Sequence, residues 1–116
     1  MESPGFWQFL DRLLVEHEIV IDRPKGSAHP RYPELIYPLD YGYLSGTTSG
    51  DGAGIDVWVG SLHSGIITGC VCTVDLFKKD IELKILVGCT SEEVKVVREF
   101  HQDRTMQNLY IPKNAP

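Results

Sequence analysis

The sequence lacks several features that would assign it to a common functional class. Its 116 residues carry 11 basic and 16 acidic side chains, for a net charge of −5. This shortage of positive charge argues against a general nucleic-acid-binding surface, because phosphate backbones are held by an excess of lysine and arginine. No apolar run approaches the roughly 20 residues of a membrane-spanning helix. The first apolar stretch is broken by Gln8, Asp11 and Arg12, unlike a signal peptide. We therefore expect a cytoplasmic protein with no nucleic-acid or membrane partner.

Cysteine is also scarce. The chain has three, Cys70, Cys72 and Cys89, and the C-x-C spacing places the first two on one face of a strand. A zinc site would need further ligands, yet no second C-x-x-C and no nearby histidine pair is present. Buried thiols in a reducing compartment are therefore the favoured interpretation, with zinc as the alternative.

The length suits one domain over residues 1–116. Ser3 as N-cap and Pro4 at the first helical position predict an amphipathic helix that ends near residue 16 or 17. Residues rich in β-branched side chains predict strands over 18–22, 55–59, 65–77 and 81–87, the last two joined by a hairpin at Lys78-Lys79-Asp80.

Residues 25–33 contain enough proline and glycine for an ordered loop. Thr90 and Glu93 form a capping-box pattern that opens a second helix, and residues 111–116 are expected to be loose or to lean on a neighbouring subunit. Helix, short strands, then helix is typical of a small, mainly β barrel of α+β class with both helices packed outside.

The most informative stretch is 37–59, YPLDYGYLSGTTSGDGAGIDVWV, where tyrosines precede Asp51 and Asp56. Glycine allows a tight turn in which both carboxylates point into one space, and Mg²⁺ and Mn²⁺ prefer such oxygen ligands. The alternative is a surface turn that binds nothing, because Asp-Gly pairs are ordinary loop residues.

Upstream, residues 20–32 read VIDRPKGSAHPRY, with an acid, a proline and several bases before the tyrosines. In order and spacing, residues 19–59 resemble the soluble, Mg²⁺-dependent inorganic pyrophosphatases (family I), which have an oligonucleotide-binding-like barrel. Residues at that family's motif positions are Asp22, Arg31, Tyr37, Tyr41, Tyr43, Asp51 and Asp56.

The resemblance implies a homo-oligomeric hydrolase of pyrophosphate or a related phosphoanhydride, with Mg²⁺, or alternatively Mn²⁺, as cofactor. It implies catalytic roles for Asp56 and Tyr41. The implied metal ligands are Asp22, Asp51, Asp56, Asp80 and Glu82, and the implied substrate-binding residues are Lys25, Arg31, Tyr41 and Lys84. A rival alignment uses Asp75 with Asp80 in place of Glu82 with Lys84, and the sequence does not decide between them.

Several positions depart from the family's pattern. Ala53 replaces the family's middle aspartate, which takes a proton from the attacking water, and Gly54 replaces its proline. His101 and Gln102 stand where the family has a Tyr-Lys pair, and His101 is more typical of an exposed residue near a helix end. The family's second arginine has no evident counterpart, although Lys25 or Arg23 could substitute. These departures predict reduced activity; the alternative is a non-catalytic module that binds phosphate or metal, or that forms oligomers.

Overall fold

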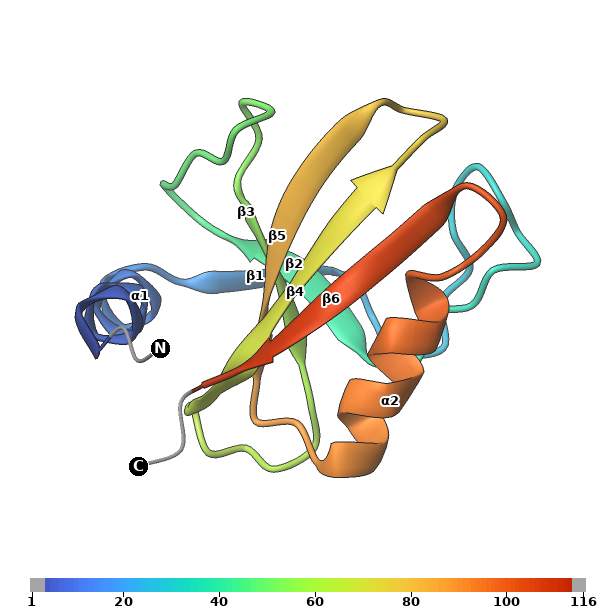
Figure 1. The fold of residues 1–116 in the computed structure, drawn as a ribbon. Coiled ribbons are helices and arrows are strands. Elements are labelled where there is room, and N and C mark those ends of the chain that lie inside the picture. The colour runs from blue at the N-terminus through green and yellow to red at the C-terminus, as the bar shows by residue number, and fades with distance from the viewer. Residues whose placement is uncertain (1–3, 114–116) are drawn as a thin grey trace.

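The computed structural model describes residues 4–113 and contains two helices and six strands (Figure 1). Helix α1 begins at Pro4, as expected, whereas the proposed N-cap Ser3 lies outside the described residues. Neither described helix combines the length and hydrophobicity that crossing a membrane requires. In chain order the elements are α1 (Pro4–Glu16), β1 (Ile19–Arg23), β2 (Asp40–Leu44), β3 (Ile55–Val59), β4 (Ile67–Asp75), β5 (Asp80–Val87), α2 (Ser91–Phe100) and β6 (Met106–Pro112).

The strands form one sheet in the order β1-β2-β3-β5-β4-β6. Neighbouring strands are antiparallel except β3 and β5, which run parallel. This architecture confirms the expected α+β class. The sheet is nevertheless open rather than a closed barrel, because β1 and β6 stand at its two ends and do not pair among the described strands.

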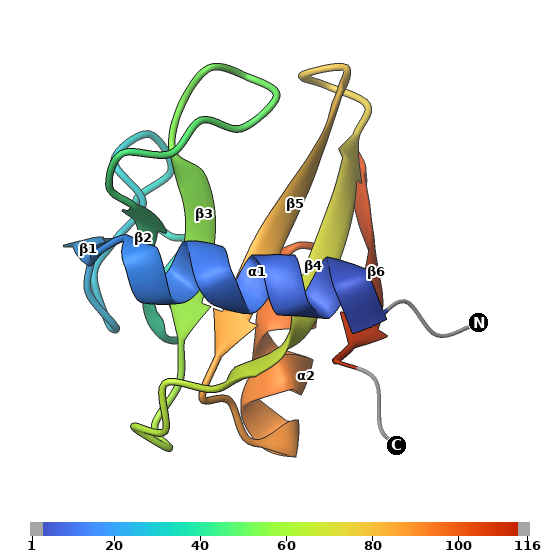
Figure 2. The same cartoon turned by 90° about the vertical axis from the view of Figure 1, so that its left-hand side faces the viewer.

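The sheet separates two apolar clusters, and each helix covers one of them. Trp7 and Leu10 of α1 pack against a cluster that includes Val57, and Figure 2 shows α1 lying across this face. Trp58 belongs to the opposite cluster, together with Val97 of α2. Alternation along β3 explains the division, because successive side chains of a strand point to opposite faces. The expected placement of both helices outside the sheet is thus confirmed.

Local signals at the second helix and at the hairpin are also confirmed. The Thr90 side chain accepts a hydrogen bond from the Glu93 N–H, and the Glu93 side chain accepts one from the Thr90 N–H, which completes the capping box. Strands β4 and β5 are joined by a tight turn in which Lys79 has a φ of 60°. Short-range hydrogen bonding fixes both features, so the sequence could predict them.

The C-terminal segment differs from the expectation. Ile111 and Pro112 lie in β6, which pairs with β4 from Met106 onward, and are not part of a loose tail; residues 114–116 of the predicted tail lie outside the described residues. The half-buried positions of β6 include the polar Asn108, while its exposed positions include Leu109. This mixture obscures the alternation by which strands are identified in a sequence.

The cysteines behave as buried thiols rather than as a metal site. Cys70 and Cys89 are buried and Cys72 is half-buried, and all three are free thiols. Burial raises the pKa of the Cys70 and Cys89 thiols to about 12, so both stay protonated at neutral pH.

Candidate functional site

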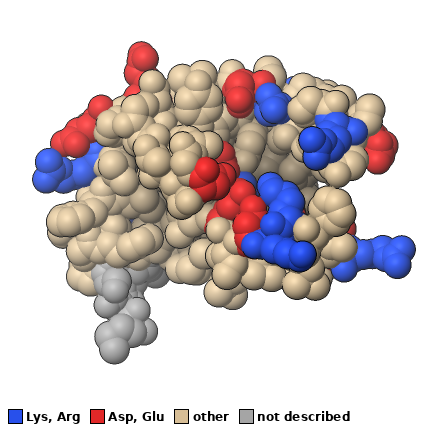
Figure 3. Space-filling model, turned by 90° about the horizontal axis from the view of Figure 1, so that it is seen from above, with Lys and Arg blue, Asp and Glu red and all other residues tan. Residues whose placement is uncertain are grey.

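A cavity of about 900 Å³ opens on the side of the sheet that α2 covers. Its walls come from strands β2 to β5, from the segments between β1 and β2 and between β2 and β3, from the turn between β4 and β5, and from the residues from the end of α2 to the start of β6. Seen from above, acidic and basic side chains meet beside a hollow near the middle of this face (Figure 3). The lining residues include these predicted site residues: Arg31, Tyr41, Asp51, Asp56, Asp80, Glu82 and Lys84.

Among the described residues, Asp22 and Lys25 are not part of this lining. Asp22 is exposed in β1 where the register with β2 shifts, and its carboxylate lies 3.7 Å from Arg23. Lys25 is exposed as well, and its backbone N–H donates to Asp40 at 2.8 Å. Their predicted roles in metal and substrate binding therefore stay predictions.

Strand pairing explains how distant parts of the motif meet. Parallel pairing of β3 with β5 sets Asp56 beside Lys84, and antiparallel pairing of β2 with β3 brings Tyr41 to the same face. Tyr41 itself lies in β2. Glycine is required next to it, because a Cβ on Gly42 would overlap the carbonyl oxygen of Val20 in β1.

Lys84 holds the centre of the site. It is 6% exposed, and its ammonium donates to Tyr41 Oη at 2.9 Å, Asp56 Oδ2 at 2.8 Å and Glu82 Oε1 at 2.7 Å. An ammonium has three N–H donors, so the protein already uses all of them. In this arrangement two carboxylates share the single positive charge of Lys84, and the ammonium has no donor left for a ligand.

The electrostatics of this cluster follow from burial and from these contacts. Burial opposes the charge of Lys84, but Tyr41, Asp56 and Glu82 together raise the pKa of its ammonium above the ordinary value. Burial alone would raise the pKa of Glu82, yet the Lys84 ammonium lowers it. Burial raises the pKa of the Tyr41 hydroxyl, so Tyr41 is neutral. Because Lys84 donates to its oxygen, the Tyr41 hydrogen points elsewhere, toward Asp56 or toward a ligand.

The glycine turn holds Asp51 by its own hydrogen bonds. Oδ1 of Asp51 accepts from the Ser49 hydroxyl at 2.6 Å and from the Ala53 N–H at 2.9 Å. These bonds lower the pKa of this exposed carboxyl. The Ala53 side chain is exposed in the same turn, so an aspartate at this position would meet no packing obstacle.

The carboxylates do not form a resident metal site in this arrangement. Within residues 4–113, no three Asp, Glu, His or Cys side chains come close enough together to hold a metal ion. Asp56 and Glu82 converge, but they converge on Lys84. The cation between them is therefore an ammonium, and the predicted roles of these residues as Mg²⁺ ligands stay predictions.

The two alternative alignments place different acids at the site. Oδ1 of Asp75 accepts two backbone N–H bonds, at 2.9 and 3.0 Å, which hold the turn between β4 and β5. Asp80 lies 3.8 Å from the ammonium of Lys78. Glu82 contacts Lys84 directly, so these contacts favour the alignment with Glu82 and Lys84.

The expectation of an exposed His101 is wrong. His101 is 5% exposed, and its Nε2 accepts the indole N–H of Trp58 at 3.1 Å. Burial, assisted by the charge of Lys84, lowers the pKa of His101 to about 3, so the ring is neutral. Because an indole nitrogen only donates, the ring proton of His101 resides on Nδ1. Trp58 lies 43 residues earlier in the chain, so no local pattern could indicate this contact.

Comparisons with known proteins identify the fold. No family model and no curated protein matches the sequence. Solved structures do: an inorganic pyrophosphatase from Coxiella burnetii aligns with a TM-score of 0.59 and 14% identity, over 82% of this chain and 84% of that one. An inorganic phosphatase from Anaplasma phagocytophilum aligns with a TM-score of 0.55 and 16% identity, over 79% and 80% of the two chains. The inorganic pyrophosphatase of Helicobacter pylori aligns with a TM-score of 0.55 and 14% identity, over 81% of each chain. At this identity the likeness shows the fold alone, and the chain has a pyrophosphatase-like fold.

Proposed function

We propose that this protein is a divergent pyrophosphatase-like hydrolase that acts slowly on pyrophosphate or on a related phosphoanhydride. One observation carries the proposal: in a pyrophosphatase-like fold, Asp51, Asp56 and Glu82 line the same cavity as Arg31 and Tyr41. Acids, a guanidinium and a phenol are the groups that a phosphoanhydride and its counter-ions require.

In this reaction a water oxygen bonds to one phosphorus and the bridging P–O bond breaks. The leaving phosphate keeps the electron pair, and two phosphates and a proton result. Arg31 is exposed at the cavity and is free to pair with phosphate oxygens in the bidentate manner of guanidinium groups. The neutral Tyr41 hydroxyl supplies a second donor when its hydrogen turns from Asp56 to the ligand.

Magnesium would enter with the substrate. Seven acidic and three basic side chains line the cavity, and this excess of negative charge repels free pyrophosphate. A divalent cation on the pyrophosphate removes that repulsion, so we infer that the magnesium or manganese complex is the species bound. The protein would contribute carboxylate oxygens to that complex, foremost those of the exposed Asp51.

We attribute the proposed slow turnover to the absence of a carboxylate at Ala53. The resemblance places an aspartate there that accepts the proton of the attacking water, and a methyl group cannot do so. Loss of a general base costs about 10²- to 10⁴-fold in rate. Among the acids that line the cavity, Asp51 alone shares the turn with Ala53. Its Oδ1 already accepts two hydrogen bonds within that turn, so this oxygen does not replace the missing base.

Phosphate release tests the proposal. Purified protein is incubated with pyrophosphate and with nucleoside and sugar diphosphates, in Mg²⁺ and in Mn²⁺. The expected result is slow release that Asp56→Asn abolishes and that Glu99→Gln, on the exposed surface of α2, leaves unchanged. Release no faster than that of Asp56→Asn with every substrate would refute hydrolysis, and binding measured without turnover would assign the cavity to ligand recognition alone.

A further inference from the structure

The cavity is larger than bare pyrophosphate needs. Clefts of roughly 300–1,000 Å³ accommodate ligands of drug size, and this one measures about 900 Å³. Pyrophosphate is much smaller than such ligands, so most of the space would be left to solvent. The remaining walls of the cavity should therefore indicate what else the ligand carries.

Those walls are aromatic. The acids at the base, such as Asp56 and Glu82, come from the sheet, whereas aromatic rings come from three segments around it. These rings are Tyr32 between β1 and β2, Phe77 in the turn between β4 and β5, and Phe100 at the end of α2. In Figure 1 the segment between β1 and β2 lies at the right, near that end of α2, and the turn between β4 and β5 lies at the top.

Two of these rings present free surface to a ligand. Phe77 is 73% exposed and Tyr32 is 44% exposed, although both line the cavity. Covering an exposed aromatic ring that lines a cavity removes apolar surface from water and so favours binding. These rings would be covered by a ligand that fills the cavity.

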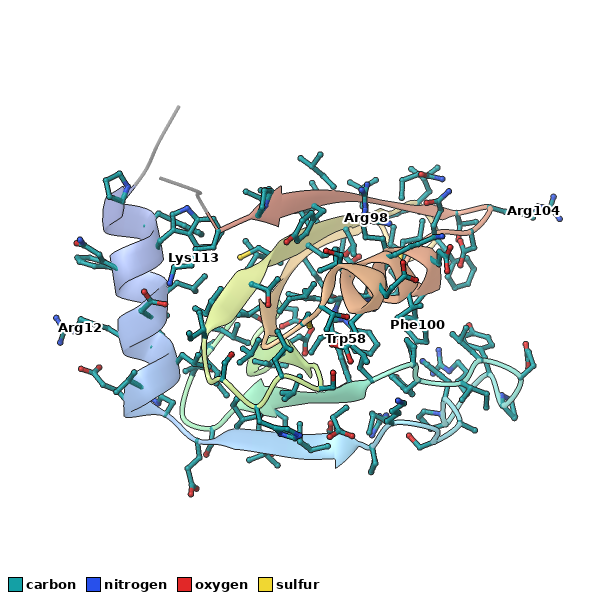
Figure 4. The ribbon with its side chains drawn as sticks, turned by 90° about the horizontal axis from the view of Figure 1, so that it is seen from below. Arg12, Trp58, Arg98, Phe100, Arg104 and Lys113 are labelled. Carbon is teal, nitrogen blue, oxygen red and sulfur yellow. The ribbon has the colours of Figure 1, made fainter. Side chains whose placement is uncertain are left out.

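The third ring is a fixed platform. Phe100 lies 5.0 Å from the ring of Tyr37 and 5.2 Å from that of Trp58, measured between centroids. Both supporting rings are buried, and Figure 4 shows Trp58 and Phe100 between α2 and β2. Such a cluster holds Phe100 in one orientation, which reduces the entropy lost when a flat group stacks on it.

The charged base of the cavity offers little to pyrophosphate alone. Of its three basic side chains, Lys84 has all its donors engaged within the protein. Another part of the ligand would therefore add affinity that these cations do not supply. Stacking on aromatic side chains supplies it without further cations.

We propose that the ligand of this cavity is a diphosphate that carries an aromatic ring, with the diphosphate over the acids and Arg31 and the ring against Phe77, Tyr32 and Phe100. This proposal rests on the proposed function for the diphosphate, and the aromatic walls add the ring. Nucleoside diphosphates and aryl diphosphates belong to this class, whereas free pyrophosphate fills only the base.

Binding of analogues that cannot be hydrolysed tests the proposal separately from catalysis. The probes are methylenediphosphonate and its phenyl and methyl monoesters, titrated by calorimetry in the presence of Mg²⁺. The two esters have the same charge and differ in the ring. We expect the phenyl ester to bind roughly 5- to 150-fold more tightly than the methyl ester, the range typical of one stacked ring.

Substitutions of Phe77 and Tyr32 test whether these rings cause the tighter binding of the phenyl ester. Phe77→Ala and Tyr32→Ala should each reduce the advantage of the phenyl ester severalfold and leave methylenediphosphonate binding unchanged. Phe9→Ala is the matched control, because Phe9 is 71% exposed on α1, across the sheet from the cavity. Because Phe77 and Tyr32 are exposed, both variants should keep the fold, and circular dichroism spectra of the variants check this.

The outcomes separate the two proposals. Equal affinity for the two esters, or an advantage that survives both substitutions, would overturn the aromatic ligand while leaving the proposed hydrolysis of pyrophosphate intact. Tighter binding of the phenyl ester without phosphate release from any substrate would retain the ligand class and overturn the hydrolase. No binding of any probe would overturn both.

Discussion

Replacing Lys84 by methionine tests whether this residue is the internal cation of the site. Lys84→Met keeps the length of the apolar stem and removes the ammonium, so Asp56 and Glu82 lose their shared partner. Breaking a buried ion pair costs about 3–5 kcal/mol when a charge is left unpaired. The side chains of Asp56 and Glu82 are 27% and 17% exposed, so water reaches both of them. We therefore expect a loss near the lower limit, about 3 kcal/mol at pH 7.

The loss of stability in Lys84→Met should depend on pH. Lys84 lowers the pKa of Glu82 in the folded protein, which contributes stability above the unfolded value of about 4.5 that is lost as pH falls through the folded value. The variant lacks this contribution. The difference in free energy of unfolding between the two proteins should therefore be greatest near pH 7 and should shrink below pH ~4.5.

Urea denaturation at pH 7 and at pH ~3.5 measures the difference, with Lys95→Met on the exposed surface of α2 as control. Mg²⁺ adds a second readout, because Asp56 and Glu82 without Lys84 can accept a divalent cation. Millimolar Mg²⁺ should raise the melting temperature of Lys84→Met more than that of the unmodified protein. A penalty equal to that of Lys95→Met, or one that does not change with pH, would refute the assignment of Lys84 as the cation of this site.

Three further predictions follow from the same structure. The folded protein keeps His101 neutral, while the unfolded chain takes up its proton below pH ~6.5. The control is His101→Gln, whose amide can still accept the Trp58 N–H. Relative to this variant, the free energy of unfolding of the unmodified protein should fall by about 2 kcal/mol from pH 7 to pH 5. Urea denaturation that shows the same pH dependence for both proteins would contradict this. Thr90→Ala removes the cap of α2 and should cost about 1 kcal/mol in thermal or urea unfolding, and a cost near zero would show that Glu93 caps the helix alone. Ala53→Asp should raise phosphate release roughly 10²-fold or more, with Ala53→Asn as the uncharged control; an equal rate in both variants would show that more than this one group is missing.

Much of the fold and part of the site could be predicted from local sequence. Thr90 with Glu93, the Lys78-Lys79-Asp80 hairpin and the first helical residue Pro4 are each set by hydrogen bonds or dihedral limits within a few residues. The order of tyrosines and aspartates likewise predicted that Asp51 and Asp56 share a space with Arg31 and Tyr41, and one cavity contains all four.

Other features depended on partners that the sequence does not place nearby. Strand β6 carries no clear alternation, and its pairing with β4 decides its conformation. The openness of the sheet follows from which strands occupy its two ends. Neither property is encoded in a short window, because strand pairing joins residues far apart in the chain.

By itself, then, the sequence determined the α+β class, the helix and hairpin boundaries and the set of polar residues available to the cavity. Only the tertiary structure decided how those residues are used. It places the Lys84 ammonium between Glu82, two residues away, and Asp56, 28 residues away. It also buries His101 against Trp58, 43 residues away. The reason is physical: backbone preferences act over one or two turns of chain, whereas the protonation and pairing of a side chain depend on the burial and charges that the folded sheet brings around it.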